Sequence, residues 1–152
     1  MKQVLCKVGN SLFGIDIEKV QGIEKKMDVT PVPNTPKLIR GISNLRGSVV
    51  PIINLHEKLG MDNNENDSEK TYIITRIGEL LVGFMVDSVA EIVELNDGSL
   101  IDVPQIVKDE GTSYIQFVLN VNKQLVLVLD VDEILDESER TNLNKLVDDV
   151  TN

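Results

Sequence analysis

Few side chains in this 152-residue sequence could perform covalent chemistry: it has one cysteine, Cys6, and one histidine, His56. Cys6 alternates with the apolar residues Val4 and Val8, so a buried structural thiol explains it better than a nucleophile does. His56 follows a predicted strand and fits a surface residue as well as a general base. The sequence contains no Gly-x-Ser-x-Gly turn, phosphate-binding loop or dinucleotide fingerprint. We therefore expect no catalytic residues and no cofactor.

Acidic residues raise the possibility of a metal site. Residues 62–69 open with the spacing of a calcium-binding loop, but the sixth position is Asp67 where glycine is needed. The twelfth position is Ile73, where a bidentate glutamate belongs. A second acidic group, Asp130, Asp132, Glu133 and Asp136, fits strand-end acids and a helix start equally well. We predict a solvated connector over residues 62–69 and no metal site.

Charge and length limit the possible partners. With 25 acidic and 15 basic residues, the net charge of −10 repels phosphate backbones, so we expect no nucleic-acid partner. Apolar runs such as residues 125–129 are far shorter than the roughly 20 residues of a membrane span, and the N-terminus lacks a signal-peptide core. We expect a cytoplasmic protein without membrane insertion. Its hydrophobic content of 41% suits one domain with a core, or two small barrels that share one.

The chain resembles itself. Residues 3–23 align with residues 72–92 at a shift of 69, and residues 39–59 align with residues 115–135 at a shift of 76. The identical pairs in the first alignment are Gly9 and Gly78, Leu12 and Leu81, Gly14 and Gly83, Val20 and Val89, and Ile23 and Ile92. Identities are few, so chance resemblance between two β segments is the alternative. We favour an internal duplication with copies over about residues 3–59 and 72–135.

Each copy is predicted to form about five short strands. Alternating apolar residues predict a half-buried strand at the start of each copy. Gly9-Asn10 and Gly78-Glu79 then supply turns into strands over residues 12–17 and 80–86. Later strands are expected over the ranges 20–27, 39–45 and 48–55 in the first copy, and 89–95, 114–121 and 125–131 in the second.

These strands predict an all-β fold with two five-stranded, SH3-like barrels around a shared core, within a single domain over residues 1–152. Whether the barrels exchange strands stays open. Near the C-terminus, apolar residues recur at helical spacing after Ser138, a candidate N-cap. A short helix over about residues 138–150 should close the chain.

The predicted hairpin turn at Arg46-Gly47 distinguishes the two copies, because Asn122 stands at the matching position of Arg46. Gly47 could simply close the hairpin beside a solvated Arg46. Alternatively, the guanidinium of Arg46 could anchor a partner protein, as arginine often does at the centre of an interface. The residues alone leave both interpretations open.

At this turn the sequence resembles a known family. Residues 14–20, 32–36, 39–55 and 82–89 look like the signature of the CheW-like coupling proteins of chemotaxis, in the same order along nearly the whole chain. The most specific block is Gly-x-x-Asn-Leu-Arg-Gly at residues 41–47.

The resemblance implies two five-stranded barrels and the role of a non-catalytic adaptor. Such proteins link the cytoplasmic tips of transmembrane chemoreceptors to the regulatory domain of the histidine kinase CheA, within membrane-associated receptor arrays. The receptor tip, a helical hairpin, would lie in an apolar groove between the barrels. Carried onto this sequence, the receptor-binding residues are Val20, Ile23, Gly41, Arg46, Val89 and Ile92, and the kinase-binding residues are Val29, Pro31 and Ile106.

One departure affects the groove. Members commonly carry an acid two positions after the first of these valines, where this chain has Gly22, and Glu24 is the nearest acid. Two alternative functions stay open: a coupling protein of a chemosensory pathway other than chemotaxis, and, more remotely, a small acidic hydrolase that uses carboxylates.

Overall fold

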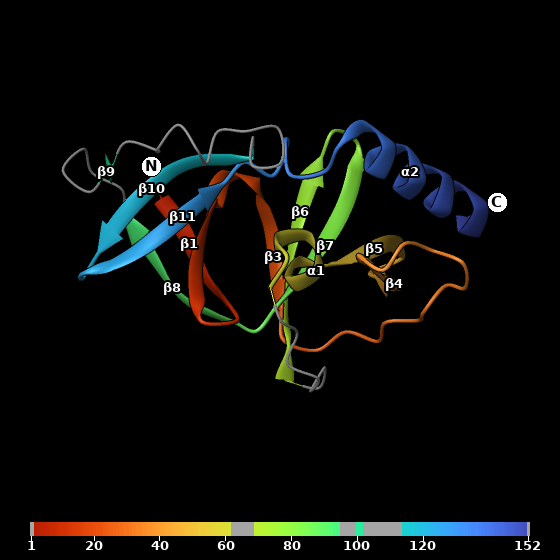
Figure 1. Cartoon of the computed structure of the whole chain (residues 1–152). Coiled ribbons are helices and arrows are strands. Elements are labelled where there is room, and N and C mark those ends of the chain that lie inside the picture. Colours follow the sequence, from red (N-terminus) through yellow and green to blue (C-terminus); the bar gives the residue numbers. More distant parts are fainter. Residues whose placement is uncertain (1, 62–68, 95–99, 102–113, 152) are drawn as a thin grey trace.

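The computed structural model describes residues 2–61, 69–94, 100–101 and 114–151 of the chain. Two β-sheets lie side by side, and a C-terminal helix extends from the second sheet (Figure 1). The first sheet has six strands in the order β8-β1-β2-β11-β10-β9, and the second has five in the order β3-β6-β7-β5-β4. The strands are β1 (Lys2–Val8), β2 (Ser11–Asp16), β3 (Val20–Glu24), β4 (Ile39–Leu45), β5 (Ser48–Asn54), β6 (Thr71–Ile77), β7 (Leu80–Val86), β8 (Ser88–Glu94), β9 (Leu100–Ile101), β10 (Ile115–Val121) and β11 (Gln124–Leu129).

Each sheet combines strands from both predicted copies. The hairpin β1–β2 pairs with β8 on one side and, in parallel, with β11 on the other. The hairpin β6–β7 pairs in the same way with β3 and β5. The two copies therefore exchange their first hairpins, which answers the question that the sequence left open. The strand orders correspond if β3 is matched with β8, β4 with β10 and β5 with β11, and this correspondence supports the proposed duplication.

The expectation of two closed barrels is not confirmed, because the strands form open sheets. The chain after each edge strand does return toward the opposite edge of the same sheet. After β8 it forms β9, whose two residues pair with β10. After β3 a single bridge joins Thr30 to Ile42 of β4, with backbone N···O distances of 2.8 and 2.9 Å. These contacts are too short to make a continuous ladder around either sheet.

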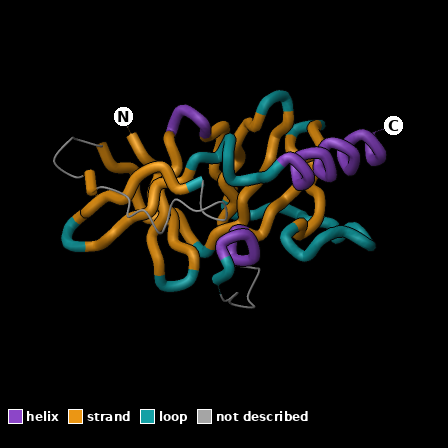
Figure 2. Tube along the Cα trace, turned by 45° about the horizontal axis from the view of Figure 1, so that its top comes forward, coloured by secondary structure: helices purple, strands orange, loops and turns teal. Residues whose placement is uncertain are grey.

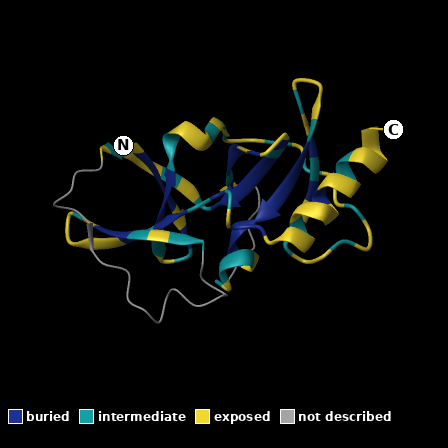
Figure 3. Cartoon of the chain, turned by 90° about the horizontal axis from the view of Figure 1, so that it is seen from above, coloured by how far each residue is buried: buried dark blue, intermediate teal, exposed yellow. Residues whose placement is uncertain are grey.

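A shared core lies between the sheets, as expected. We use this name for a cluster that includes Val4, Cys6, Phe13 and Ile15 from the first sheet and Ile53, Ile73, Val82 and Phe84 from the second. The buried strands occupy the middle of the molecule, whereas the outer surface of the C-terminal helix is exposed (Figure 3). Burial of this many apolar side chains is the main stabilising contribution to the fold.

Each sheet also has a core on its other face. The inner core of the second sheet is made by Val50, Ile52, Tyr72, Ile74 and Met85, and that of the first by Leu5, Leu119, Val126 and Val128. Glycine at position 83 allows the inner core of the second sheet to pack closely, because a Cβ there would lie 2.7 Å from the Cδ1 atom of Ile52. Gly14 has a similar place in the first sheet, because a Cβ there would lie 3.3 Å from the Cγ2 atom of Val128.

Strand β1 differs from the half-buried strand that its alternation predicted. Cys6 is buried in the shared core, as predicted, and burial raises the pKa of its thiol to about 12. Leu5, on the opposite face, is also buried, in the inner core of the first sheet. The strand is buried on both faces because the sheet has an apolar core on each side. Among the residues of β1, only Lys2 and Lys7 are exposed.

Two α-helices and a short 3-10 helix, η1 (Ile17–Lys19), lie at the periphery of the strands (Figure 2). Helix α1 (Leu55–Leu59) was not predicted, and the side chain of Asn54 caps it by accepting from the His56 N–H at 3.1 Å. Helix α2 (Glu137–Thr151) was predicted almost to its bounds, but Ser138 is not its N-cap. Asp136 accepts from Glu139 N at 2.7 Å, and Glu139 accepts from Asp136 N at 2.8 Å, which is a reciprocal capping box. In the described part of the chain, no helix combines the length and apolar character that a membrane crossing requires.

Candidate functional site

The edge strands β3 and β8 present apolar side chains on the face of the shared core. Directly paired residues of antiparallel strands point to the same face. Ile23 pairs with Ile73, and Ile92 pairs with Val4, and both partners belong to the shared core. The two repeat-equivalent strands therefore expose equivalent faces from the two sheets.

The predicted groove residues divide by depth. Val20 and Val89 are half-buried and pack against the shared core. Ile23 and Ile92 lie further out, with 39% and 53% of their surfaces exposed, and they are two of the four large apolar residues exposed in the described ranges. Exposed apolar residues at equivalent positions of two edge strands offer a surface that another molecule could cover. Both isoleucines therefore lie at the surface and not in the core.

Arg46 is held in the tight turn between β4 and β5. Its φ angle is 51° and that of Gly47 is 89°, so both residues are left-handed, as in a type I′ turn. The Asn44 side chain accepts from the Gly47 N–H at 2.9 Å. The side chain of Arg46 is 81% exposed, and its Nη2 atom lies 3.5 Å from Oε1 of Glu24 on β3. Arg46 therefore reaches strand β3, where it pairs with Glu24, the acid nearest to Gly22 in the sequence.

Gly41 is buried, unlike the other predicted receptor-binding residues, which are half-buried or exposed. It is buried in β4 with a φ angle of 152°, and a Cβ there would lie 2.3 Å from the carbonyl oxygen of Thr30. Its glycine is required for packing, because the Thr30 backbone and the Val29 side chain lie directly over it. Of the predicted kinase-binding residues, Val29 is partly buried beside the inner core of the second sheet, Pro31 is exposed, and Ile106 falls outside the described residues.

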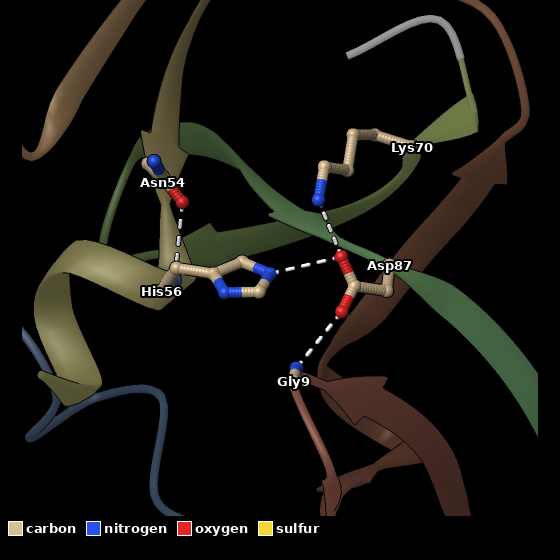
Figure 4. Close-up of polar contacts among 5 residues, drawn as sticks. All are labelled: Gly9, Asn54, His56, Lys70 and Asp87. Carbon is tan, nitrogen blue, oxygen red and sulfur yellow. Dashed lines mark hydrogen bonds and ion pairs between the residues drawn. The ribbon is translucent and has the colours of Figure 1, made fainter. Parts of the chain in front are cut away.

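His56 belongs to a buried polar cluster that sequence reasoning did not find (Figure 4). The side chain of His56 is fully buried, and its Nε2 atom lies 2.9 Å from Oδ1 of Asp87. The ammonium of Lys70, also buried, binds the same carboxylate oxygen. The backbone N–H of Gly9 donates to Oδ2 of Asp87 at 2.8 Å, and Asp87 N donates to Lys7 O at 2.9 Å.

The cluster joins parts of both sheets. Gly9 lies in the β1–β2 turn, and Asp87 lies between β7 of the second sheet and β8 of the first. Burial alone would raise the pKa of Asp87, but hydrogen bonds from Lys70, Gly9 and His56 outweigh it and lower that pKa below its usual range. Asp87 stays ionised, so it has no proton to donate as a general acid. His56 is fully buried, so it cannot reach a substrate as a general base. The cluster is a structural clamp between the sheets.

Nothing in the sequence pattern marked this clamp. His56 and Asp87 are 31 positions apart, and Lys70 stands beside the polar connector, where exposure is the ordinary expectation. The second acidic group has structural roles: Asp132 pairs with Lys19 at 2.8 Å and Asp136 caps α2. Within the described ranges, no three His, Cys, Asp or Glu side chains are placed to hold a metal ion.

Comparison with known proteins identifies a family to which this chain is similar. The family model described as the CheW-like domain matches residues 2–139. The chain is 32% identical to the chemotaxis protein CheW of Klebsiella aerogenes, covering 97% of this chain and 86% of that protein. It is 30% identical to the chemotaxis protein CheW of Treponema pallidum, with coverage of 94% and 86%.

A solved structure agrees with the fold. The crystal structure of the scaffolding protein TtCheW from Thermoanaerobacter tengcongensis is similar with a TM-score of 0.78 and 25% identity, covering 89% of this chain and 87% of that one. Sequence and fold thus agree over most of the length of each protein. The chain belongs to the CheW-like domain family.

Proposed function

We propose that this protein is a non-catalytic adaptor of chemotaxis signalling, which links the cytoplasmic tips of transmembrane chemoreceptors to the histidine kinase CheA. Family membership supports the adaptor role, because the similar proteins are named as chemotaxis proteins and one as a scaffolding protein. The Asp87–His56 cluster does not support the alternative of a carboxylate hydrolase, since Asp87 is held ionised beside a buried His56.

The receptor tip is proposed to lie along the edge strands β3 and β8. The observation that carries this proposal is the matched pair of exposed isoleucines, Ile23 and Ile92, each next to a half-buried valine on the shared-core face. A helix could bury both isoleucines in a helix-in-groove mode. Arg46 would add a polar anchor at the end of β3 through its contact with Glu24.

The kinase is proposed to bind elsewhere, through its regulatory domain, to the segment that carries Val29 and Pro31. This segment borders a hollow of about 530 Å³ whose apolar side chains include Leu45, Val49 and Val150. Val150 of α2 is 44% exposed there, which supports a protein contact. Leu45 of this hollow also lies beside Arg46, so the two proposed surfaces adjoin, and the adaptor would hold kinase and receptor side by side at the receptor array.

The test is a three-component binding experiment. The purified chain is mixed with a receptor cytoplasmic fragment and the CheA regulatory domain from the same organism, and complexes are separated by size-exclusion chromatography. The proposal predicts each binary complex and a ternary complex. Absence of both binary complexes at micromolar concentrations would contradict it.

A further inference from the structure

We propose that a pocket beside Arg46 binds a carboxylate side chain of the receptor helix, with Arg76 and Arg46 as its hydrogen-bond donors. This inference rests on the proposed function, because it adds a polar anchor to the same receptor-binding surface. The pocket has a volume of about 230 Å³. Its lining includes Gly22 and Glu24 from β3, Leu45 and Arg46 from the β4–β5 turn, and Ile74 and Arg76 from β6.

The charges of the pocket favour an anion. The pocket lining contains two arginines, Arg46 and Arg76, and one acidic residue, Glu24, in a chain whose net charge is −10. Glu24 contacts Arg46 only at 3.5 Å, whereas Arg76 is exposed and makes no ion pair or side-chain hydrogen bond with the described residues. A planar guanidinium with free donors matches a carboxylate in geometry and charge. The guanidinium of Arg76 is therefore available to bind an anion at the wall of the pocket.

The backbone at the pocket points to a ligand as well. Gly22 stands inside strand β3, where glycine weakens the strand. Its φ angle is outside the left-handed region, and a Cβ there would approach only Oε1 of Glu24, at 3.9 Å. No protein group therefore requires the glycine, and the floor of the pocket is left open. Arg46 holds a left-handed conformation, as do Asn122 and Lys123 in the matching turn of the second copy, so this conformation belongs to the turn and exposes the Arg46 side chain beside the pocket.

The position of the pocket fits a side chain from a helix on β3. Ile23 pairs with Ile73 and points to the shared-core face. Its neighbours Gly22 and Glu24 pair with Ile74 and Tyr72 and point to the other face, where the pocket opens. A receptor helix that covers Ile23 along this edge strand can thus direct an acidic side chain over the edge, toward Arg76.

The inference is tested by titrating the chain with a receptor cytoplasmic fragment in low salt. Arg76→Gln should weaken binding about tenfold, because a charged hydrogen bond is lost. Lys145→Gln removes the same charge from the exposed side of α2 and should leave the affinity unchanged. Circular dichroism should show the same fold for both variants.

Each acidic residue of the receptor tip is then neutralised in turn and combined with Arg76→Gln. One acid should lose its effect in the Arg76→Gln background, which identifies the bound carboxylate. If the unmodified chain binds the fragment and Arg76→Gln binds equally well, the pocket is not an anchor, while the adaptor role stands. If the unmodified chain does not bind at all, the proposed function fails and this inference falls with it. A loss in Arg76→Gln with no coupled receptor acid would also overturn it.

Discussion

His56 and Asp87 form a contact between the two sheets in which His56 is fully buried and Asp87 partly buried, with 2.9 Å between the imidazole Nε2 and the carboxylate Oδ1 (Figure 4). Asp87 immediately precedes β8, which carries Val89 and Ile92. The same carboxylate accepts from Gly9 N in the β1–β2 turn. One side chain therefore fixes the start of an edge strand relative to both sheets, and the geometry of the proposed groove depends on it.

Replacing Asp87 by Asn should destabilise the protein by roughly 3 kcal/mol, because Lys70 would remain buried without its anionic partner. Unfolding in urea measures the loss. Asp148→Asn, at an exposed position of α2, is the matched control and should change the free energy of unfolding by less than about 0.5 kcal/mol. Equal stability of the two variants would mean that the clamp does not hold the sheets together.

Acid should weaken the same clamp. The pKa of Asp87 is lowered in the folded protein from an ordinary value of 3.8, so its contribution to stability is present above that value. The contribution is lost as the pH falls through the lower, folded-state pKa. The difference in free energy of unfolding between the unmodified chain and Asp87→Asn should therefore be constant from pH 7 to about 5 and shrink below about pH 4. A difference that does not depend on pH would contradict this assignment.

Cys6 should react slowly with a water-soluble thiol reagent in the native protein and quickly in denaturant. Its thiol is fully buried, and burial raises its pKa to about 12, so the reactive thiolate is scarce near neutral pH. Absorbance of the released chromophore measures both rates. Rapid labelling of the folded protein would show that β1 opens locally or that its register is wrong.

Arg46→Ala should leave the fold nearly intact, with a change of no more than about 0.5 kcal/mol, because the side chain is largely exposed. Receptor binding should weaken instead. Arg46→Asn adds a useful comparison, since Asn tolerates the φ angle of 51° and should be at least as stable as the unmodified chain. A large shift in melting temperature with unchanged receptor binding would make this turn purely structural.

Much of the fold could be predicted because its signals are local. Alternation and Gly-containing turns located the hairpins, and helical spacing located α2. The exchange of hairpins could not be predicted, since alternation fixes the faces of a strand and not the sheet that it joins. Helix α1 was missed because five residues are too few to show a helical period. The N-cap at Asp136 had a readable signal, the acid three residues later at Glu139, which Ser138 obscured.

The residues of the proposed site could be predicted, but their burial could not. The resemblance pointed to the valines and isoleucines of β3 and β8, but only the structure separates half-buried Val20 and Val89 from exposed Ile23 and Ile92. Gly41 illustrates the limit of motif transfer, because its glycine serves the close approach of Thr30. The clamp at Asp87 depends on contacts between distant segments, which one sequence does not reveal.

The distinction between valines and isoleucines decides how the groove should be probed. A charge at Val20 or Val89 should weaken receptor binding, yet each valine also packs against the shared core, so Val20→Asp and Val89→Asp act on stability as well. Ile23 and Ile92 are exposed, so Ile23→Asp and Ile92→Asp separate the two effects.

The most direct measurement is the affinity of Ile92→Asp for a receptor cytoplasmic fragment, compared with its affinity for the CheA regulatory domain. We predict a loss of receptor affinity by a factor of about 100 or more, because a receptor helix would have to cover an unpaired charge. Kinase binding and the melting temperature should be nearly unchanged, and Leu125→Asp, at another exposed apolar residue, should not affect the receptor. Normal receptor binding by a folded Ile92→Asp variant would contradict the account of the groove.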